Sequence, residues 1–114
     1  MYIDDFKKTE SDIAVDFCHR CDEVGFQVRL EVKLPSKVHR SGEMRADALI
    51  FDLGEAICAV EFKSNRKHAP KPSSRQHQAY CGIGMPFFYC CGENEIEDTI
   101  ENICALAEKL QDLN

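Results

Sequence analysis

The amino-acid sequence predicts an α/β fold, with a mixed central sheet flanked by helices. Amphipathic helical patterns lie near both ends of the chain, and four strand-like segments and one short helix lie between them. The resulting order, αβββαβα, places helices on both faces of the sheet and requires a right-handed crossover before the last strand. A chain of 114 residues suits one domain, spanning residues 1–114.

The first predicted helix covers residues 7–24. Its apolar residues recur at helical spacing, and Gly25 provides the stop after the last turn. Glu10 falls on the apolar stripe, one turn before Ile13. We therefore expect the Glu10 carboxylate to point inward.

Three strands are predicted next, over residues 26–34, 45–52 and 56–63. A polar connection separates the first strand from the second. Only residues 53–55 separate the second from the third, and they include a glycine that can adopt a positive φ. We expect a hairpin with a three-residue loop.

The hairpin register brings two acids together. If Asp52 pairs with Ala56, the numbers of all later partners sum to 108, and Asp47 lies directly opposite Glu61. Lys63 lies on the face of Glu61 because strand side chains alternate. Two opposed carboxylates suit a hard cation such as Mg²⁺. The alternative is a solvated hairpin end, which the apolar neighbours disfavour because buried carboxylates need partners.

The second half of the chain supplies a short helix over residues 74–81, a strand over residues 86–91 and a helix over residues 95–110. The strand is apolar without alternation, as expected when both faces are covered. The last helix carries a continuous apolar stripe.

Charge is unevenly distributed along the chain. The formal net charge is −6, yet nine of the fourteen basic residues lie in residues 33–45 and 63–75. Two solvated loops are an alternative explanation of these basic runs. No apolar stretch approaches a membrane span, and the acidic N-terminus is unlike a secretory signal. An odd number of cysteines, seven, also suits a reducing compartment, so we expect a cytoplasmic protein with no membrane partner.

Two sequence motifs resemble the core of the PD-(D/E)XK nucleases. They are residues 45–51 (RADALIF), in which Ala46 replaces the usual proline, and residues 60–63 (VEFK). Glu10 resembles the first-helix acid of these enzymes, and Gln76 with Tyr80 resembles their Gln-x-x-x-Tyr helix motif. The resemblance covers residues 10–91. It is greatest to stand-alone virus-type replication-repair nuclease (VRR-NUC) domains, followed by Holliday-junction resolvases.

The resemblance implies a restriction-endonuclease-like fold and Mg²⁺- or Mn²⁺-dependent hydrolysis of phosphodiester bonds in DNA. A deoxyribonuclease of this kind acts as an endonuclease in replication, repair or recombination, and structure-specific cutting of junctions or flaps is one form of the activity. The implied metal ligands are Glu10, Asp47, Glu61 and the Phe62 carbonyl oxygen. The implied catalytic residues are Asp47, Glu61, Lys63 and Gln76. Lys63 would stabilise developing charge or orient the attacking water, which Gln76 would help to position.

The implied partner is DNA, bound by a homodimer of bacterial or phage origin. The expected DNA-binding residues are Lys37, Arg40, Arg45, Arg66, Lys67, Lys71, Arg75 and Tyr80. A helical tyrosine such as Tyr80 is nevertheless more often packed than in contact with substrate. We expect His77 and Gln78 to face solvent.

Two alternatives to an enzyme stay open. The first is a catalytically inactive module with a nuclease fold that binds DNA or a protein partner, because a fold alone does not establish activity. The intact acids and lysine of the motif favour the enzyme. The second alternative is a zinc-organised interaction domain. Its ligands would be Cys18, Cys21, Cys90 and Cys91.

Overall fold

The computed structural model describes residues 9–113. The element order αβββαβα is confirmed, with two added 3-10 helices, η2 and η3. The elements are α1 (Glu10–Glu23), β1 (Gln27–Pro35), β2 (Glu43–Asp52), β3 (Glu55–Lys63), η2 (Arg66–His68), α2 (Arg75–Cys81), β4 (Phe87–Cys91), η3 (Glu93–Glu95) and α3 (Ile96–Asp112).

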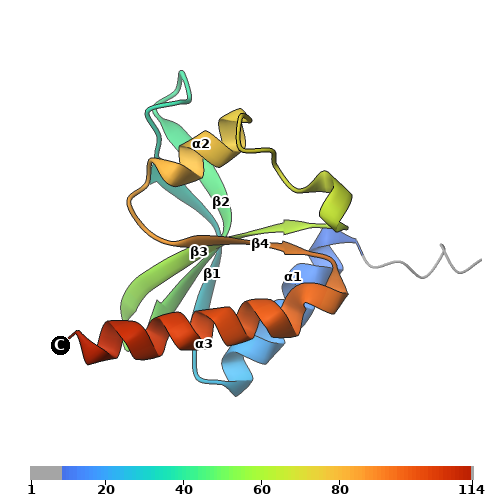
Figure 1. Ribbon diagram of the computed structural model, residues 1–114, viewed down its shortest axis with the longest axis vertical. Coiled ribbons are helices and arrows are strands. Elements are labelled where there is room, and N and C mark those ends of the chain that lie inside the picture. Colours follow the sequence, from blue (N-terminus) through green and yellow to red (C-terminus); the bar gives the residue numbers. More distant parts are fainter. Residues whose placement is uncertain (1–8, 114) are drawn as a thin grey trace, which may run out of the picture.

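One mixed sheet forms the centre of the molecule. Its strand order is β1-β2-β3-β4, and only the pair β3 and β4 is parallel. Helices α1 and α3 cover one face of the sheet, and α2 lies over the other (Figure 1). The crossover between the parallel strands runs through α2, which sets this short helix above the end of β3. The predicted mixed sheet with helices on both faces is confirmed.

Two clusters of buried side chains fill the layers. The larger cluster includes Phe17, Ile50 and Ile103, and lies between the sheet and the pair α1 and α3. The smaller cluster lies under α2 and includes Leu49 and Tyr80. Strand β3 contributes to both clusters, which explains why it is buried almost throughout. Within residues 9–113, no helix has the length and apolar character needed to cross a membrane.

The turn between β2 and β3 is shorter than the sequence predicted. Asp52 pairs with Glu55, so the loop has two residues instead of three. Its residues, Leu53 and Gly54, have φ values of 52° and 81°. A two-residue loop with both φ values positive is the type I′ turn that matches the twist of antiparallel strands. The predicted pairing of Asp52 with Ala56 is therefore wrong.

A β-bulge restores the predicted register further along the hairpin. The register shifts between Ile50 and Phe51, which leaves Ile57 as an extra residue on β3. Beyond the bulge, Leu49 pairs with Ala59 as predicted. The shorter turn and the bulge compensate each other, so the acids of the two strands keep their relative positions along the hairpin.

Strand β2 changes the face to which its side chains point at Asp47. Ala48 packs in the cluster beneath α1 and α3, whereas Ala46, two residues earlier, packs in the cluster beneath α2. A regular strand would place both on one face. On β1, Leu30 pairs with Ala48 and Val32 pairs with Ala46. Glu31, which lies between Leu30 and Val32, has a φ of 53°. A positive φ at a non-glycine residue costs on the order of 1 kcal/mol. Asp47 therefore lies at an irregular point of the sheet.

Candidate active site

Helix α2 fixes the carboxylate of Glu61. Glu61 lies on β3 and is 5% exposed. One of its oxygens accepts a hydrogen bond of 2.8 Å from Gln76 Nε2, and the other accepts one of 2.6 Å from the Tyr80 hydroxyl. The two donors lie four residues apart and so project from one face of the helix. The Ser74 side chain caps the start of this helix, at the His77 amide.

Asp47 is held by the backbone of β3. Its Oδ2 accepts a hydrogen bond of 2.8 Å from the Phe62 amide. The ladder between β2 and β3 ends at the pair Ala48 and Val60, so the Asp47 side chain takes the place of the next ladder bond. A directly opposed backbone pair of Asp47 and Glu61 was expected, and the ladder does not include it. The two carboxylates still interact, because the charge of Glu61 raises the pKa of Asp47.

The electrostatics of this pair depend on burial. Burial raises the pKa of Asp47 to about 6, and the negative charge of Glu61 adds to that rise. The Phe62 amide and the Lys63 cation oppose it. Lys63 Nζ lies 3.5 Å from Glu61 Oε2, with 20% of the lysine side chain exposed. One cation therefore lies beside one buried carboxylate, Glu61, and one half-buried carboxylate, Asp47.

Tyr80 stays protonated beside Glu61. Burial raises the pKa of its hydroxyl well above the usual range, and the charge of Glu61 raises it further. Tyr80 has no exposed surface and its hydroxyl donates to Glu61. The Tyr80 hydroxyl is buried and engaged within the protein, so in this structure it is not available to a DNA contact, and the predicted contact stays a prediction.

The donors around Asp47 suit a hard divalent cation. The Phe62 N–H points towards β2, and the carbonyl of a strand residue points to the same neighbouring strand as its N–H. The Phe62 carbonyl therefore joins the carboxylates of Asp47 and Glu61 as an oxygen donor. Mg²⁺ and Mn²⁺ favour oxygen donors, and Mg²⁺ commonly uses one or two carboxylates and retains several waters. These residues fit such an ion.

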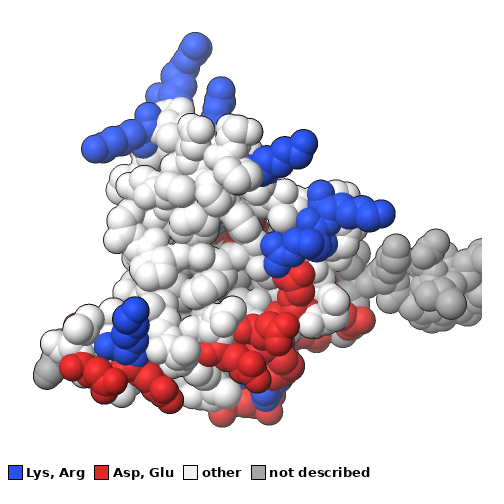
Figure 2. All heavy atoms as spheres, viewed as in Figure 1, with Lys and Arg blue, Asp and Glu red and all other residues white. Residues whose placement is uncertain are grey.

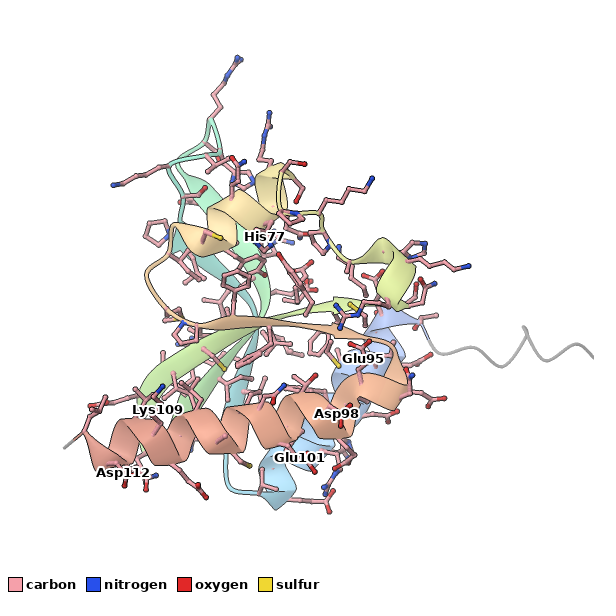
Figure 3. All side chains as sticks on the ribbon, in the orientation of Figure 1. His77, Glu95, Asp98, Glu101, Lys109 and Asp112 are labelled. Atoms are coloured by element: carbon pink, nitrogen blue, oxygen red, sulfur yellow. The ribbon has the colours of Figure 1, made fainter. Side chains whose placement is uncertain are left out.

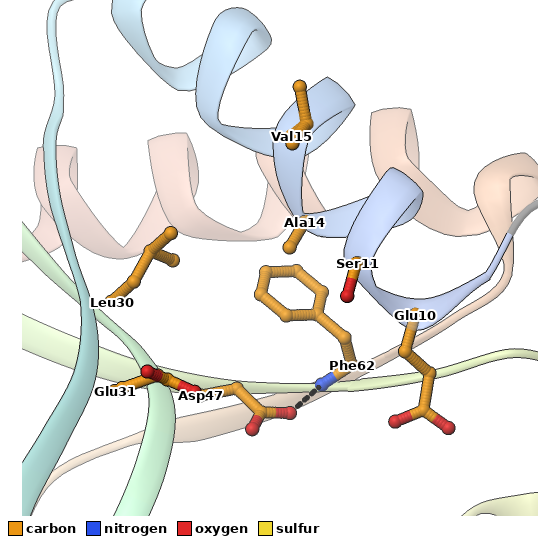
Figure 4. Close-up of a pocket in the computed structure, with 8 residues that line it drawn as sticks. All are labelled: Glu10, Ser11, Ala14, Val15, Leu30, Glu31, Asp47 and Phe62. Atoms are coloured by element: carbon orange, nitrogen blue, oxygen red, sulfur yellow. Dashed lines mark hydrogen bonds between the residues drawn. The ribbon is translucent and has the colours of Figure 1, made fainter.

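Glu10 differs from its predicted position. It is the first residue of α1 and is exposed, so its carboxylate does not enter the core. Glu10 and Asp47 line one cavity and lie on the same side of the Phe62 ring (Figure 4). Within the described residues, no group of three His, Cys, Asp or Glu side chains is arranged to hold a metal ion. Of the three predicted acidic ligands, the structure thus brings together Asp47 and Glu61, and Glu10 stays exposed.

The cysteines of the described residues also form no group arranged to hold a metal ion. All seven are free thiols, and the four proposed as zinc ligands are divided between α1 and β4. Burial raises the pKa of Cys21 to about 12, which disfavours the thiolate that zinc requires. The zinc-organised alternative is not supported in the part of the chain that the structure describes.

Six of the predicted DNA-binding residues are exposed. They are Lys37, Arg40, Arg45, Lys67, Lys71 and Arg75. Figure 2 shows basic side chains over the end of the molecule that carries α2 and η2, and acidic side chains over α1 and α3. Arg66 is exposed too, but its guanidinium forms a two-bond ion pair with Glu95. Arg66 is therefore not free to bind phosphate in this conformation.

His77 was expected to face solvent and instead packs against β4. His77 lies on α2 (Figure 3). Its Nδ1 lies 2.8 Å from the Tyr89 hydroxyl, and its ring makes an edge contact with Phe87. Tyr80 stacks on Phe87 at a centroid separation of 5.3 Å. The period-two spacing of Phe87 and Tyr89 could have indicated this contact, because it places both rings on one face. Gln78 is exposed, as predicted.

Comparison with known proteins supports the fold. No family model and no curated protein matches the sequence. A solved structure described as "VRR_NUC domain" matches with a TM-score of 0.58 and 22% sequence identity, over 82% of this chain and 97% of that one. At this identity the likeness establishes the fold. The protein therefore has a restriction-endonuclease-like fold, and a solved structure that it resembles is a VRR_NUC domain.

Proposed function

We propose that this protein is a Mg²⁺- or Mn²⁺-dependent deoxyribonuclease that cuts DNA internally. The observation that supports the proposal is the convergence of Asp47, Glu61 and Lys63 in one partly buried site. A pair of neighbouring carboxylates, in which Asp47 has a raised pKa, is unfavourable for folding, and such groups concentrate at functional sites. Their position on a nuclease-type fold adds to the argument.

The proposed reaction is hydrolysis of a phosphodiester. A water oxygen forms a bond to phosphorus, the bond from phosphorus to the leaving sugar oxygen breaks, and a phosphate monoester and an alcohol result. A bound Mg²⁺ or Mn²⁺ supplies Lewis-acid activation and charge neutralisation. Asp47, Glu61 and the Phe62 carbonyl would hold it. Lys63 stabilises negative charge that develops on the phosphoryl oxygens. Gln76 and Tyr80 keep the Glu61 carboxylate oriented, which fixes its angle to Lys63.

One experiment tests the activity directly. The purified protein is incubated with labelled plasmid, flap and four-way-junction DNA in Mg²⁺, Mn²⁺, Ca²⁺ or EDTA. We expect cleavage in Mg²⁺ or Mn²⁺, and we expect Ca²⁺ to support binding better than cleavage because its looser coordination positions water poorly. Lys63→Met, which retains the side-chain length without the charge, should bind DNA and cut it far more slowly. Undiminished cleavage in EDTA would contradict the proposal.

A catalytically inactive DNA- or protein-binding module is the second candidate. The observation in its favour is the exposed position of Glu10, which forms no metal-binding group with Asp47 and Glu61 among the described residues. Metal-independent DNA binding without cleavage of any substrate would support this candidate over the first. A homodimer, expected from the resemblance, stays a prediction, and sedimentation at micromolar concentration tests it.

A further inference from the structure

Residues 64–74, here called the basic segment, connect β3 to α2. The segment contains Arg66, Lys67 and Lys71 and no acidic residue. Apart from the single turn of η2, it forms no helix or strand. Hydrogen bonds within it are local, such as the one of 2.9 Å from the Lys67 amide to the Asn65 side chain. Local bonds do not fix the segment relative to the sheet, so its position depends on contacts with other elements.

An ion pair ties the basic segment to the start of α3. The Arg66 guanidinium donates two hydrogen bonds to the Glu95 carboxylate, one from Nε at 3.0 Å and one from Nη2 to the other oxygen. Glu95 lies 29 residues further along the chain, and Figure 3 shows it beside the first turn of α3. Two parallel bonds orient the guanidinium as well as hold it. The pair therefore restrains η2 relative to α3.

The same carboxylate also holds the end of β4. Glu95 Oε1 accepts a hydrogen bond of 3.0 Å from the Cys91 amide, and Cys91 is the ladder partner of Lys63. The backbone of Glu95 is fixed in turn, because its carbonyl oxygen accepts a hydrogen bond of 2.8 Å from the hydroxyl of the buried Thr99. One carboxylate thus joins the strand end beside Lys63 to Arg66, which follows Lys63 by one turn of chain.

The turn after β4 approaches the basic segment closely. Gly92 has a φ of 110°, and a Cβ atom added there would lie 3.4 Å from the Ser64 carbonyl oxygen and 2.8 Å from Asn94 Oδ1. This approach of main chain to main chain does not depend on the ion pair. Two separate contacts therefore bring the turn of residues 92–95 against the first residues of the basic segment.

We propose that Glu95 is a positioning residue for DNA binding, which acts through Arg66 to hold the basic segment where Lys67 and Lys71 meet the DNA backbone. The inference rests on the proposed nuclease function, and it assigns Arg66 to Glu95 in place of a DNA phosphate. If Arg66 moved to a phosphate, the Glu95 carboxylate would lose its cation close to an anionic ligand, which is unfavourable. A segment that is ordered in advance also loses less entropy when it binds.

A double-mutant cycle tests the proposal. Arg66→Gln, Glu95→Gln and the double variant are compared with the wild type, because glutamine at position 95 keeps an acceptor for the Cys91 amide and removes the ion pair. Affinity for labelled duplex DNA is measured by fluorescence anisotropy in Ca²⁺. We expect each single variant to bind roughly two- to fivefold more weakly, and the double variant to bind as Arg66→Gln does.

The sign of the Glu95→Gln effect distinguishes positioning from a DNA contact. Removal of this acidic charge strengthens binding if Arg66 is thereby released to a phosphate, whereas loss of positioning weakens it. Tighter binding by Glu95→Gln would therefore overturn the proposal. A log-log salt slope that falls by about 0.9 in Arg66→Gln would also contradict it, because that change marks a lost phosphate contact.

Glu97→Gln is the matched control. Glu97 also lies in the first turn of α3, and it accepts two hydrogen bonds from an arginine, Arg20 of α1. The substitution removes the same charge and the same type of ion pair from the same end of α3. DNA affinity should change by less than about twofold. A loss as large as that of Glu95→Gln would reveal a general effect of charge or stability and reject the positioning role.

A measurement without DNA tests the positioning itself. The amides of Lys67 and Ala69 donate hydrogen bonds to Asn65 and Arg66, at the two ends of η2. Hydrogen exchange at these amides should be faster in Arg66→Gln and Glu95→Gln than in the wild type or Glu97→Gln. Equal exchange in all of these proteins would show that the ion pair does not hold the segment, and the inference would fail.

Cleavage separates this inference from the nuclease proposal. In Mg²⁺, Glu95→Gln should raise the KM for DNA more than it lowers kcat. If the wild type cleaves DNA and all members of the cycle bind it equally, the positioning inference fails and the nuclease proposal holds. If the affinities show the expected coupling and no protein cleaves DNA, the nuclease proposal fails and the positioning inference holds.

Discussion

The ionised carboxylate of Asp47 is unfavourable for folding, because burial and the charge of Glu61 both disfavour its charged form. In the absence of metal its pKa rises from 3.8 to about 6, first through burial and then through the charge of Glu61. A folded-state pKa above the unfolded value means that the native state binds the proton more tightly. Protonation of Asp47 therefore stabilises the native state. This stabilisation is complete below about pH 4 and is lost as the pH rises through about 6.

The first prediction follows from the upward shift of the Asp47 pKa. In EDTA, the free energy of unfolding of the wild type should fall by on the order of 1–2 kcal/mol between about pH 5 and pH 7.5. Asp47→Asn should lack most of this fall, and should be the more stable protein at the higher pH, because the amide can still accept from the Phe62 N–H without carrying a charge. Urea denaturation of both proteins at several pH values measures the difference.

Bound Mg²⁺ should reverse the order of stability, so that the wild type becomes more stable than Asp47→Asn. Mg²⁺ at about one hundred times its dissociation constant should stabilise the wild type by about 2.7 kcal/mol, since it binds only the native state. Asp47→Asn should gain much less and should not cleave DNA. If the mutant were less stable without metal and gained as much from Mg²⁺, Asp47 would have a structural partner in place of a metal.

The second prediction concerns Tyr80. Tyr80→Phe removes the 2.6 Å hydrogen bond to Glu61 and keeps the ring that stacks on Phe87. A hydrogen bond to a charged group contributes about 1.5–3 kcal/mol, so the variant should lose stability in that range. Cleavage should slow by roughly tenfold or more because Glu61 is less well positioned.

DNA affinity separates this supporting role from a DNA contact. It should stay unchanged in Tyr80→Phe, since the hydroxyl is buried. The matched control is Tyr89→Phe, whose hydroxyl contacts His77 and not Glu61. A several-fold loss of affinity in Tyr80→Phe at unchanged stability would restore the DNA contact that the sequence suggested.

At the scale of single elements, the hairpin of β2 and β3 shows how local strain and register are balanced. Leu53 occupies the first central position of a type I′ turn with a φ of 52° and with 84% of its surface exposed. Leucine is poorly suited to that conformation, and its side chain gains little from packing there. The bulge beyond the turn offsets its short loop, so Leu49 pairs with Ala59 as in the predicted register.

The third prediction tests this interpretation. Leu53→Asn creates the Asn-Gly pair favoured in type I′ turns, and should raise the free energy of unfolding by about 0.5–1 kcal/mol without changing activity. Gly54→Ala, at a φ of 81°, should lower it. Chemical denaturation measures both. No gain in Leu53→Asn would indicate that the turn conformation adds little strain.

At the scale of the whole molecule, charge is divided between two ends. No Asp or Glu occurs between Glu61 and Glu93, whereas α3 carries Glu97, Asp98 and Glu101. The acidic residues of α3 lie along the layer opposite α2, and the basic side chains gather around α2 and η2 (Figures 2 and 3). DNA should therefore approach the α2 side and avoid the layer of α1 and α3.

The fourth prediction uses this division. Replacing both Lys67 and Lys71 with alanine should weaken DNA binding, and the log-log salt slope should fall by about 0.9 for each duplex phosphate that these lysines neutralise. Lys109→Ala, on the exposed surface of α3, is the matched control and should leave the slope unchanged. Titrations at several salt concentrations give the slopes. An equal slope in the double variant would mean that residues 67–71 point away from DNA.

Much of the fold was predictable because it depends on local patterns. Helical spacing, glycine stops and apolar runs identified all seven main elements and their order. Alternation along β3 correctly placed Lys63 beside Glu61, and the i, i+4 spacing correctly placed Gln76 and Tyr80 on one face. The length of the turn was mispredicted because a leucine at a positive φ leaves no compositional signal.

The sequence by itself determined the elements, their order and the residue types of the site, because those depend on spacing within a few turns or a few strand residues. Only the tertiary structure decided what each group does. It buried Tyr80 as the partner of Glu61, set Asp47 on the Phe62 amide and left Glu10 exposed. It also opened the cavity between α1 and β1. These outcomes depend on contacts between residues distant in the chain, on the irregularity at Glu31 and Asp47, and on how the layers pack, which no local pattern encodes.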